Sequence, residues 1–313
     1  MRTPPAIPPG LAAAAARGPA WADWLDRLPR LLGDVLDNWA LALDDWPLAP
    51  DGAATHGRCA LVVPVRTTDG VPAALKLTFP HDEAATEHLA LRRWGGNGAV
   101  TLLRADPHRF ALLLERLGPG DLGDLPADDA VAVVAGLYAR LHVPALPQTP
   151  RLSERLAGWA DRLAALPSGA PVPRRYVERA VALARAFATD PAVDARLLHG
   201  DLHDENVLAG RREPWLAIDP KPLAGDPHWE PVPLLWNRWQ EAVASGDLRG
   251  ALRRRLAVAC EVGGLDPDRA RDLTVVRVMV NALWELEDAA ALDRAPDRDW
   301  LTRQVAVAKA AQD

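Results

Sequence analysis

The segment Gly118-Pro119-Gly120 divides the chain into two parts with different residue periodicity, and this division most constrains the fold. Before it, short apolar stretches bounded by turn residues predict β-strands, at residues 39–43, 60–66, 73–78, 100–106 and 110–115. After it, apolar residues recur every three or four positions and predict helices, at residues 127–142, 151–166, 174–189, 231–245, 249–262 and 268–291. We therefore expect an α+β, bilobal fold with a small N-terminal sheet lobe and a larger, mostly helical C-terminal lobe.

The sheet lobe is expected to be antiparallel, because Asp69-Gly70 between two apolar stretches is a hairpin signal. One main helix is expected among the strands, at residues 81–94, and another at 19–39, which Pro29 should break or bend. The expected organisation is a flexible N-terminal arm at residues 1–18, an N-lobe at 19–117 and a C-lobe at 118–313.

Composition excludes several classes of protein. Of 313 residues, 49% are hydrophobic and 25% are charged, which is typical of a globular chain and not of a disordered or fibrous one. A net charge of −6 argues against nucleic acid as a partner, because phosphate binding usually needs a basic face. Residues 121–313 carry 24 basic and 29 acidic side chains, and such an acidic excess would suit a cationic ligand.

The cysteines and the hydropathy pattern bear on the compartment. Cys59 and Cys260 are far apart in sequence and lie in no metal-binding spacing, which favours two free thiols in a reducing environment. No apolar run approaches the roughly 18 residues of a membrane span. We therefore expect a cytoplasmic protein that does not enter a membrane.

The densest polar segment of the chain is Leu198-His199-Gly200-Asp201-Leu202-His203-Asp204-Glu205-Asn206. A short strand follows Asn206, and the chain can return as a second strand that ends just before Asp219. Such a hairpin would bring Asn206 and Asp219 side by side, and one carboxylate with one amide oxygen suits Mg²⁺. Asp201 would then be available to orient and deprotonate an acceptor hydroxyl.

A zinc site is the main alternative for this segment, because His199 and His203 are four residues apart with carboxylates nearby. The metalloprotease pattern, however, requires Glu directly after the first His, and Gly200 occupies that position. Zinc is therefore the weaker interpretation.

The order of Asp201, Asn206 and Asp219 resembles the catalytic loop and metal-binding Asp of the protein-kinase-like fold. His199-Gly200-Asp201-Leu202-His203, together with Ile-Asp-Pro-Lys-Pro-Leu-Ala-Gly-Asp-Pro at 218–227, resembles the aminoglycoside/hydroxyurea antibiotic resistance kinases, which include streptomycin 6-kinases. The resemblance extends from about residue 19 to about residue 290. It implies a bilobal protein-kinase-like fold, with ATP and Mg²⁺ as cofactors.

The resemblance also implies nucleotide-binding residues in the N-lobe. Lys76, in the apolar stretch Ala74-Leu75-Lys76-Leu77, would contact the α- and β-phosphates. Glu87 would hold that lysine, with Glu83 as the other candidate. Residues 112–117 would connect the lobes, and the backbone of Glu115 and Leu117 would bind the adenine. Residues 51–57 stand where a glycine-rich phosphate loop would lie.

Only three of the 36 basic side chains are lysine, at 76, 221 and 309. Arginine cannot easily replace a compact ammonium packed against phosphates, which supports Lys76 as the nucleotide anchor. Lys221 has three open interpretations: a structural role, an ion pair with an acidic neighbour, or an approach to the phosphate. Lys309 is expected to be solvated.

The substrate would be selected by the helical lobe. Late-helix carboxylates hold the ammonium groups of aminoglycosides in related enzymes, which implies Glu285 and Asp288 here, beside Glu287. Asp226 is a further substrate-binding candidate that could instead brace the metal loop, and Glu230 could cap or brace the next helix. The tryptophans at helical spacing (Trp21 and Trp24, Trp236 and Trp239) are expected to pack in the core or between lobes rather than stack on a sugar.

The expected activity is ATP-dependent transfer of the γ-phosphate to a hydroxyl of a small molecule, foremost an aminoglycoside such as streptomycin, with Asp201 as the base. Hydroxyurea, or an endogenous amino-sugar or choline-like metabolite, is the alternative acceptor, because family membership alone does not fix function. From another class, the chain could be a nucleotide-binding pseudokinase or interaction module. The intact set of Lys76, Asp201, Asn206 and Asp219 argues against that reading.

Overall fold

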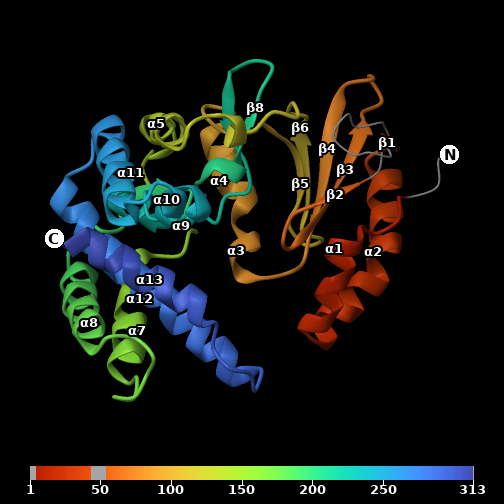
Figure 1. The fold of residues 1–313 in the computed structure, drawn as a ribbon. Helices are drawn as coiled ribbons and strands as arrows, with labels where there is room; N and C mark the ends of the chain where they lie inside the picture. The colour runs from red at the N-terminus through yellow and green to blue at the C-terminus, as the bar shows by residue number, and fades with distance from the viewer. Residues whose placement is uncertain (1–4, 44–53, 313) are drawn as a thin grey trace. The chain divides into compact units, whose positions relative to one another are not determined.

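The computed structural model describes residues 5–43 and 54–312 (Figure 1). Internal contacts distinguish two compact units: Met1–Gly120 with Leu208–Ile218, and Asp121–Val207 with Asp219–Asp313. The first unit thus ends at Gly120 rather than at residue 117, and it includes a segment, 208–218, that sequence analysis placed in the C-lobe.

The first unit is built on an antiparallel sheet with strand order β1-β3-β4-β6-β5, in which β2 also pairs with β3. Its strands are β1 (Ala42–Leu43), β2 (Thr55–His56), β3 (Ala60–Arg66), β4 (Pro72–Thr78), β5 (Leu102–Asp106) and β6 (Ala111–Glu115). The hairpin predicted at Asp69-Gly70 joins β3 to β4, and Gly70 adopts φ +77°, a conformation that glycine reaches without steric cost. The predicted strands are confirmed, with shorter β1 and β5.

Helix α2 (Pro19–Asn38) covers one face of this sheet (Figure 1). Leu25, Leu28 and Leu32 recur at helical spacing and share one hydrophobic core with strand residues such as Leu61 and Leu75. A large apolar side chain contributes roughly 1.5–3 kcal/mol when it is fully buried, so this face fixes the helix on the sheet. Of the predicted break or bend at Pro29, the break is absent, because α2 continues through this exposed residue.

The N-terminal arm also differs from the prediction. Residues 9–17 form α1 (Pro9–Ala12) and the 3-10 helix η1 (Ala13–Arg17). Leu11 is 1% exposed and belongs to the core shared by α2 and the sheet. Ile7 also packs against this core, and the Arg17 guanidinium donates to the carbonyl of Arg58. So few apolar residues in a Pro- and Ala-rich segment give too little periodicity to predict these contacts.

The main helix expected at residues 81–94 is divided into α3 (Asp82–Ala85) and α4 (Glu87–Trp94). Thr86 separates them, with φ −110° and ψ −1°. Gly95, at φ +57°, ends α4 in a left-handed conformation, as glycine commonly does after a helix. The division makes Glu87 the first residue of α4.

The second unit is mostly helical, as predicted (Figure 1). Its α-helices are α5 (Ala127–Gly136), α6 (Tyr138–Leu141), α7 (Leu152–Ala164), α8 (Arg174–Ala188), α9 (Pro233–Trp236), α10 (Trp239–Ala244), α11 (Leu248–Gly263), α12 (Pro267–Ala291) and α13 (Arg298–Gln312). Its 3-10 helices are η2 (Leu122–Asp124), η3 (Asp204–Asn206) and η4 (Pro227–Trp229). Among the described residues, no helix is both long enough and apolar enough to cross a membrane.

Two helical features of the second unit were not predicted. The helix expected at 231–245 is interrupted between α9 and α10, where Arg238 has φ +50°. The buried guanidinium of Arg255 donates hydrogen bonds to the carbonyls of Asn237 and Arg238 and thereby holds the interruption. Helix α13 was missed altogether, although Leu301 and Val307 on one of its faces are buried.

Candidate active site

The polar 199–206 loop (residues 199–206) begins where β7 (Arg196–Leu198) ends. Strand β7 pairs antiparallel with β10 (Leu223–Gly225), and Leu198 lies opposite Leu223. Just beyond this pair, the backbone N–H of Lys221 donates to the carbonyl of His199 at 2.8 Å. The two sequence motifs, which are twenty residues apart, are therefore held together by backbone hydrogen bonds.

Gly200 is the position where this pairing requires glycine. Its φ is +82°, and a Cβ placed on it would lie 2.2 Å from the carbonyl oxygen of Lys221. A side chain would therefore meet backbone that is itself hydrogen-bonded and cannot move aside cheaply. This explains why the residue that precedes Asp201 is glycine.

We expect Gly200→Ala to lower the free energy of unfolding by about 2–4 kcal/mol, from the left-handed backbone and the overlap together. Urea-induced unfolding measures this loss. Gly246→Ala is the matched control, because Gly246 has φ +75° but open space around its Cα. It should lose only about 1–2 kcal/mol. Equal losses in both variants would show that the contact with Lys221 adds nothing.

Glu230 holds the start of the 199–206 loop by hydrogen bonds to its backbone. This fully buried carboxylate accepts hydrogen bonds from the backbone N–H groups of His199 and Gly200, both at 2.8 Å. His142 Nε2 lies 3.3 Å from the same carboxylate. Burial raises the pKa of Glu230, but the hydrogen bond and charge of His142, with smaller contributions from His199, outweigh it and leave the pKa below its usual value. Glu230 thus stays ionised at neutral pH and braces the loop, not merely a helix end.

Asn206 closes the loop, and its amide is oriented by its neighbours. Nδ2 donates to the carbonyl of Asp201 at 2.8 Å and lies 3.2 Å from His203 Nε2. Because a carbonyl must be met by the amide nitrogen, the oxygen Oδ1 points the other way. Among the described residues, Oδ1 of Asn206 has no hydrogen-bond partner.

The predicted hairpin between Asn206 and Asp219 is confirmed: β8 (Val207–Ala209) and β9 (Trp215–Ala217) pair in a two-stranded sheet. Asp219 follows with φ +57°, a left-handed conformation that is uncommon for a residue other than glycine and less strained for Asp than for most. Such strain, of order 1 kcal/mol, persists where the surroundings impose it and is frequent at functional sites.

Asp201 faces a lysine. Nζ of Lys221 donates to Oδ2 of Asp201 at 2.5 Å, and both side chains are partly exposed. Of the three roles left open for Lys221, the ion pair with an acidic neighbour is therefore present in the structure.

The oxygen donors near the loop fit a hard cation. Oδ1 of Asn206 and the carboxylate of Asp219 are the ligand types that Mg²⁺ prefers, and Mg²⁺ usually takes its remaining ligands from water and phosphates. The described residues contain no group of three or more His, Cys, Asp and Glu side chains arranged to hold a metal ion. A protein-only cage is thus not what this loop provides.

In the first unit, Lys76 of β4 and Glu87 of α4 form a buried ion pair. Nζ of Lys76 lies 2.6 Å from Oε1 of Glu87, and the two residues are 5% and 3% exposed. The preference for Glu87 over Glu83 as the partner is therefore confirmed. A pair this deeply buried is costly to desolvate, so it contributes less to stability than its distance suggests and points to function.

The 112–117 segment leaves a free backbone group at one position. The Glu115 carboxylate accepts from the Thr101 N–H at 2.9 Å and from Arg212 Nε at 3.1 Å, and its own N–H donates to the Thr101 carbonyl. The Gly118 N–H donates to Ala209. Between them, the backbone of Leu117 makes no hydrogen bond to any described residue.

The stretch at 51–57 lies partly outside the described residues, which resume at Ala54. Within the described part, Thr55–His56 is strand β2, and the Gly57 N–H donates to the carbonyl of Ala60.

Comparison with known proteins finds relatives over most of the chain. Residues 45–289 match the family model described as "Aminoglycoside/hydroxyurea antibiotic resistance kinase". A streptomycin 6-kinase of Streptomyces glaucescens is 42% identical over 309 residues, which cover 92% of this chain and 94% of the relative. A hydroxyurea phosphotransferase of Kitasatospora aureofaciens is 40% identical over 306 residues, 94% of this chain and 83% of the relative.

The chain belongs to the aminoglycoside/hydroxyurea antibiotic resistance kinase family. It is therefore an enzyme, a small-molecule phosphotransferase, and membership implies ATP as the phosphate donor with a divalent metal ion. A choline/ethanolamine kinase family protein of Mesorhizobium loti superposes with a TM-score of 0.58 at 18% identity, covering 90% of this chain and 95% of that one. This likeness confirms the protein-kinase-like fold.

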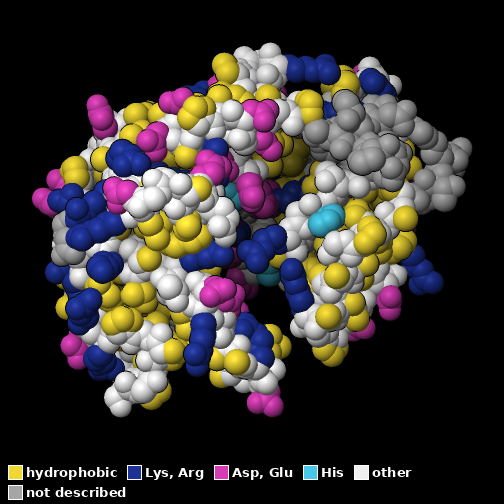
Figure 2. Space-filling model, viewed as in Figure 1, with side chains coloured by type: hydrophobic (Ala, Val, Ile, Leu, Met, Phe, Trp, Pro, Cys, Tyr) yellow, Lys and Arg dark blue, Asp and Glu magenta, His cyan; other side chains and the backbone are white. Residues whose placement is uncertain are grey.

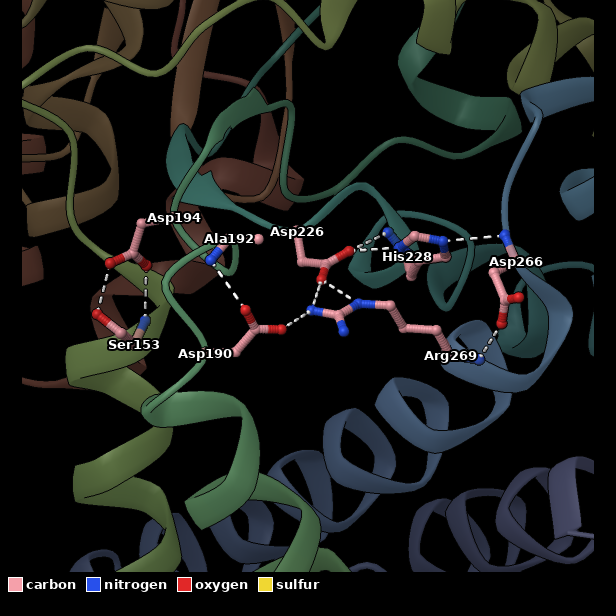
Figure 3. Close-up of polar contacts among 8 residues, drawn as sticks. All are labelled: Ser153, Asp190, Ala192, Asp194, Asp226, His228, Asp266 and Arg269. Atoms are coloured by element: carbon pink, nitrogen blue, oxygen red, sulfur yellow. Dashed lines mark hydrogen bonds and ion pairs between the residues drawn. The ribbon is translucent and has the colours of Figure 1, made fainter.

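Of the two roles left open for Asp226, its contacts favour a bracing role (Figure 3). Asp226 is 3% exposed, and both its oxygens are engaged, one by the backbone and ring of His228 and the other by Arg269. Burial raises the pKa of Asp226, but the hydrogen bonds from His228 and Arg269 outweigh burial and leave the pKa below its usual value. The carboxylate therefore stays ionised. The Arg269 guanidinium also donates a hydrogen bond to Asp190, and His228 Nε2 accepts one from the backbone N–H of Asp266. In this structure Asp226 is a brace, without an oxygen to offer a substrate.

The late-helix carboxylates of the kinase are also mostly paired. Glu285 binds Arg294 and accepts from the Asp297 N–H, and the Arg294 hydrogen bond is the main cause of its lowered pKa. Glu287 binds Arg162. Asp288 is exposed, and its carboxylate makes no hydrogen bond or ion pair with a described residue. On the face shown in Figure 2, basic and acidic side chains are likewise intermixed.

The tryptophans named from the sequence pack against other side chains. Trp21 stacks on Phe79 with ring centroids 3.8 Å apart, Trp24 is buried, and Trp236 meets Trp300. One cluster was missed because its members are far apart in sequence: Trp159 stacks on Trp229, and the Arg277 guanidinium lies 4.8 Å from the Trp229 ring.

Proposed function

We propose that this kinase transfers the γ-phosphate of ATP to a hydroxyl of an aminoglycoside such as streptomycin, with Asp201 as the base. The observation that carries the proposal is the 199–206 loop. Glu230 holds its first N–H groups, Asn206 holds the carbonyl of Asp201, and Oδ1 of Asp201 is left without a partner among the described residues. A base needs this combination of fixed backbone and open oxygen.

ATP is assigned to residues of the first unit. The Lys76 ammonium, oriented by Glu87, would contact the α- and β-phosphates. The Leu117 N–H and carbonyl, which make no hydrogen bond with described residues, would bind the adenine. Glu115 is a weaker candidate for that role, since its N–H already donates to Thr101.

Asn206 and Asp219 would hold the metal ion, which we propose to be Mg²⁺. When bound, the ion neutralises charge on the phosphates. Hydrogen bonds orient the amide of Asn206, and Asp219 adopts a left-handed backbone conformation of a kind frequent at functional sites. Both observations support the assignment.

The remaining work of the protein is positioning. In phosphoryl transfer most of the catalysis comes from alignment and charge neutralisation rather than from a strong base. Asp201 therefore needs to accept the hydroxyl proton only as the oxygen attacks. An ordinary carboxylate in a fixed orientation suffices for this.

The acceptor has two candidates. Streptomycin 6-kinases of two Streptomyces species are 42% identical to this chain, and the exposed Asp288 offers a carboxylate to a cationic sugar. The hydroxyurea phosphotransferase is nearly as similar, at 40%. Because Asp226, Glu285 and Glu287 are already paired with arginines, a small neutral acceptor such as hydroxyurea is the second candidate.

An acceptor panel separates the two. ATP consumption and the mass of the product are measured with streptomycin, two other aminoglycosides and hydroxyurea. We expect kcat/KM for streptomycin to exceed that for hydroxyurea by at least tenfold. The reverse order would establish the second candidate, and no phosphorylated product with any of the four, despite ATP binding, would contradict the proposed function.

A further inference from the structure

The ion pair between Lys221 and Asp201 has no evident structural purpose. Nζ lies 2.5 Å from Oδ2, while the side chains are 37% and 20% exposed. Ion pairs with this degree of exposure contribute about 0–1 kcal/mol to stability. Since arginine serves almost everywhere else in this chain, the lysine calls for an explanation from the chemistry of the site.

The backbone of Lys221 is fixed to the loop that carries Asp201. Its N–H donates to His199, and its carbonyl oxygen lies against Gly200 so closely that no Cβ fits between them. Pro220 and Pro222 flank it and restrict the chain on both sides. The ammonium therefore reaches Asp201 from a backbone that is held in place. A fixed backbone is what one side chain needs in order to orient another.

The Lys221 ammonium contacts only one of the two carboxylate oxygens of Asp201. Oδ2 of Asp201 accepts from Lys221, and Oδ1 makes no hydrogen bond with a described residue. A base must present one oxygen within about 2.6–3.2 Å of the hydroxyl, in a fixed direction. We propose that Lys221 is a positioning residue for Asp201, which holds Oδ2 so that Oδ1 faces the acceptor hydroxyl; this inference rests on the proposed function.

The same geometry explains why the residue is lysine. An ammonium is a compact donor that can engage a single oxygen, whereas a guanidinium is a planar fork that matches both oxygens of a carboxylate at once. Arginine at this position would occupy Oδ1 as well as Oδ2. Charge alone is therefore insufficient, and Lys221→Arg should not preserve the rate.

Kinetics of Lys221→Met and Lys221→Arg test the inference, with Lys309→Met as the matched control because Lys309 is exposed on α13. We expect both Lys221 variants to lower kcat by about 10- to 100-fold, as misplacement of a reacting group does. KM for ATP and the melting temperature should stay close to those of the wild type. The control should match the wild type in all three measurements.

A double variant shows whether Lys221 acts through Asp201. In an Asp201→Asn background, Lys221→Met should change the residual rate by less than twofold, because effects that share one contact are not additive. An equal loss in both backgrounds would overturn the inference and place Lys221 on the nucleotide instead.

Other results would also overturn it: a Lys221→Met variant with wild-type kcat, full activity in Lys221→Arg, or a loss of kcat that follows a lowered melting temperature. A wild-type protein that phosphorylates no acceptor would overturn the proposed function, and this inference with it. An active wild type with an equally active Lys221→Met variant would overturn the inference alone.

Discussion

The variant Asp201→Asn lowers kcat for phosphoryl transfer by about 10²–10⁴-fold, the usual contribution of a positioned general base. The Asn side chain has nearly the same shape as Asp. The backbone should therefore keep the hydrogen bond from Asn206 to the carbonyl of residue 201 and the one from the Gly200 N–H to Glu230. ATP binding should therefore stay within about twofold of the wild type. Quenched-flow or steady-state assays with the best acceptor give kcat, and fluorescence or calorimetric titration gives the Kd for ATP.

The control for this result is Asp129→Asn, which makes the same chemical change at an exposed position of α5 in the same unit. It should leave kcat unchanged. If Asp201→Asn retained more than a tenth of the wild-type kcat, Asp201 would not be the base. If it lost ATP binding as strongly as turnover, the residue would serve the nucleotide rather than the acceptor.

The variant Lys76→Met has the second large expected effect, and it acts on stability as well as on activity. Removing the ammonium deprives the Glu87 carboxylate, which is 3% exposed, of its ion pair with Lys76. Breaking a buried pair on one side costs about 3–5 kcal/mol. We expect the free energy of unfolding to fall by that amount and ATP binding to become undetectable.

A double variant, Lys76→Met with Glu87→Leu, separates the two effects. Replacing both members of a buried ion pair by apolar side chains of similar size is often neutral or stabilising. Stability should therefore return to within about 1 kcal/mol of the wild type in urea unfolding, while ATP binding stays lost. Recovery of ATP binding in the double variant would show that Lys76 acts on the fold alone.

Local patterns in the sequence predict much of this protein. The short apolar stretches at 60–66 and 73–78 and the Asp69-Gly70 turn predict the β3–β4 hairpin, because strand propensity and turn conformation depend on neighbouring residues. The spacing of Asp201, Asn206 and Asp219 likewise predicts a loop and a hairpin, and both are present. The family resemblance, rather than a local pattern, implies Glu87 as the residue that holds Lys76, and the two side chains form an ion pair.

Where a prediction depended on a distant residue, it failed or stayed open. Leu11 packs the N-terminal segment into the core of the first unit, and Arg255 donates hydrogen bonds to the backbone at the interruption between α9 and α10. Neither partner is visible from local periodicity. Asp226 lies in the 218–227 motif and was a candidate for substrate binding. Arg269 and His228, however, are hydrogen-bonded to its two carboxylate oxygens.

The sequence by itself determined the two-part α+β organisation, the hairpin and the polar loop, since each follows from the order of residues within one segment. The tertiary structure decided which charged groups contact the 199–206 loop. Lys221 forms an ion pair with Asp201 because β7 and β10 pair. Glu230 accepts a hydrogen bond from the Gly200 N–H because the chain turns back through η4. Side-chain pairing across tens of residues is set by the packing of whole elements, and a single sequence carries no local signal for it.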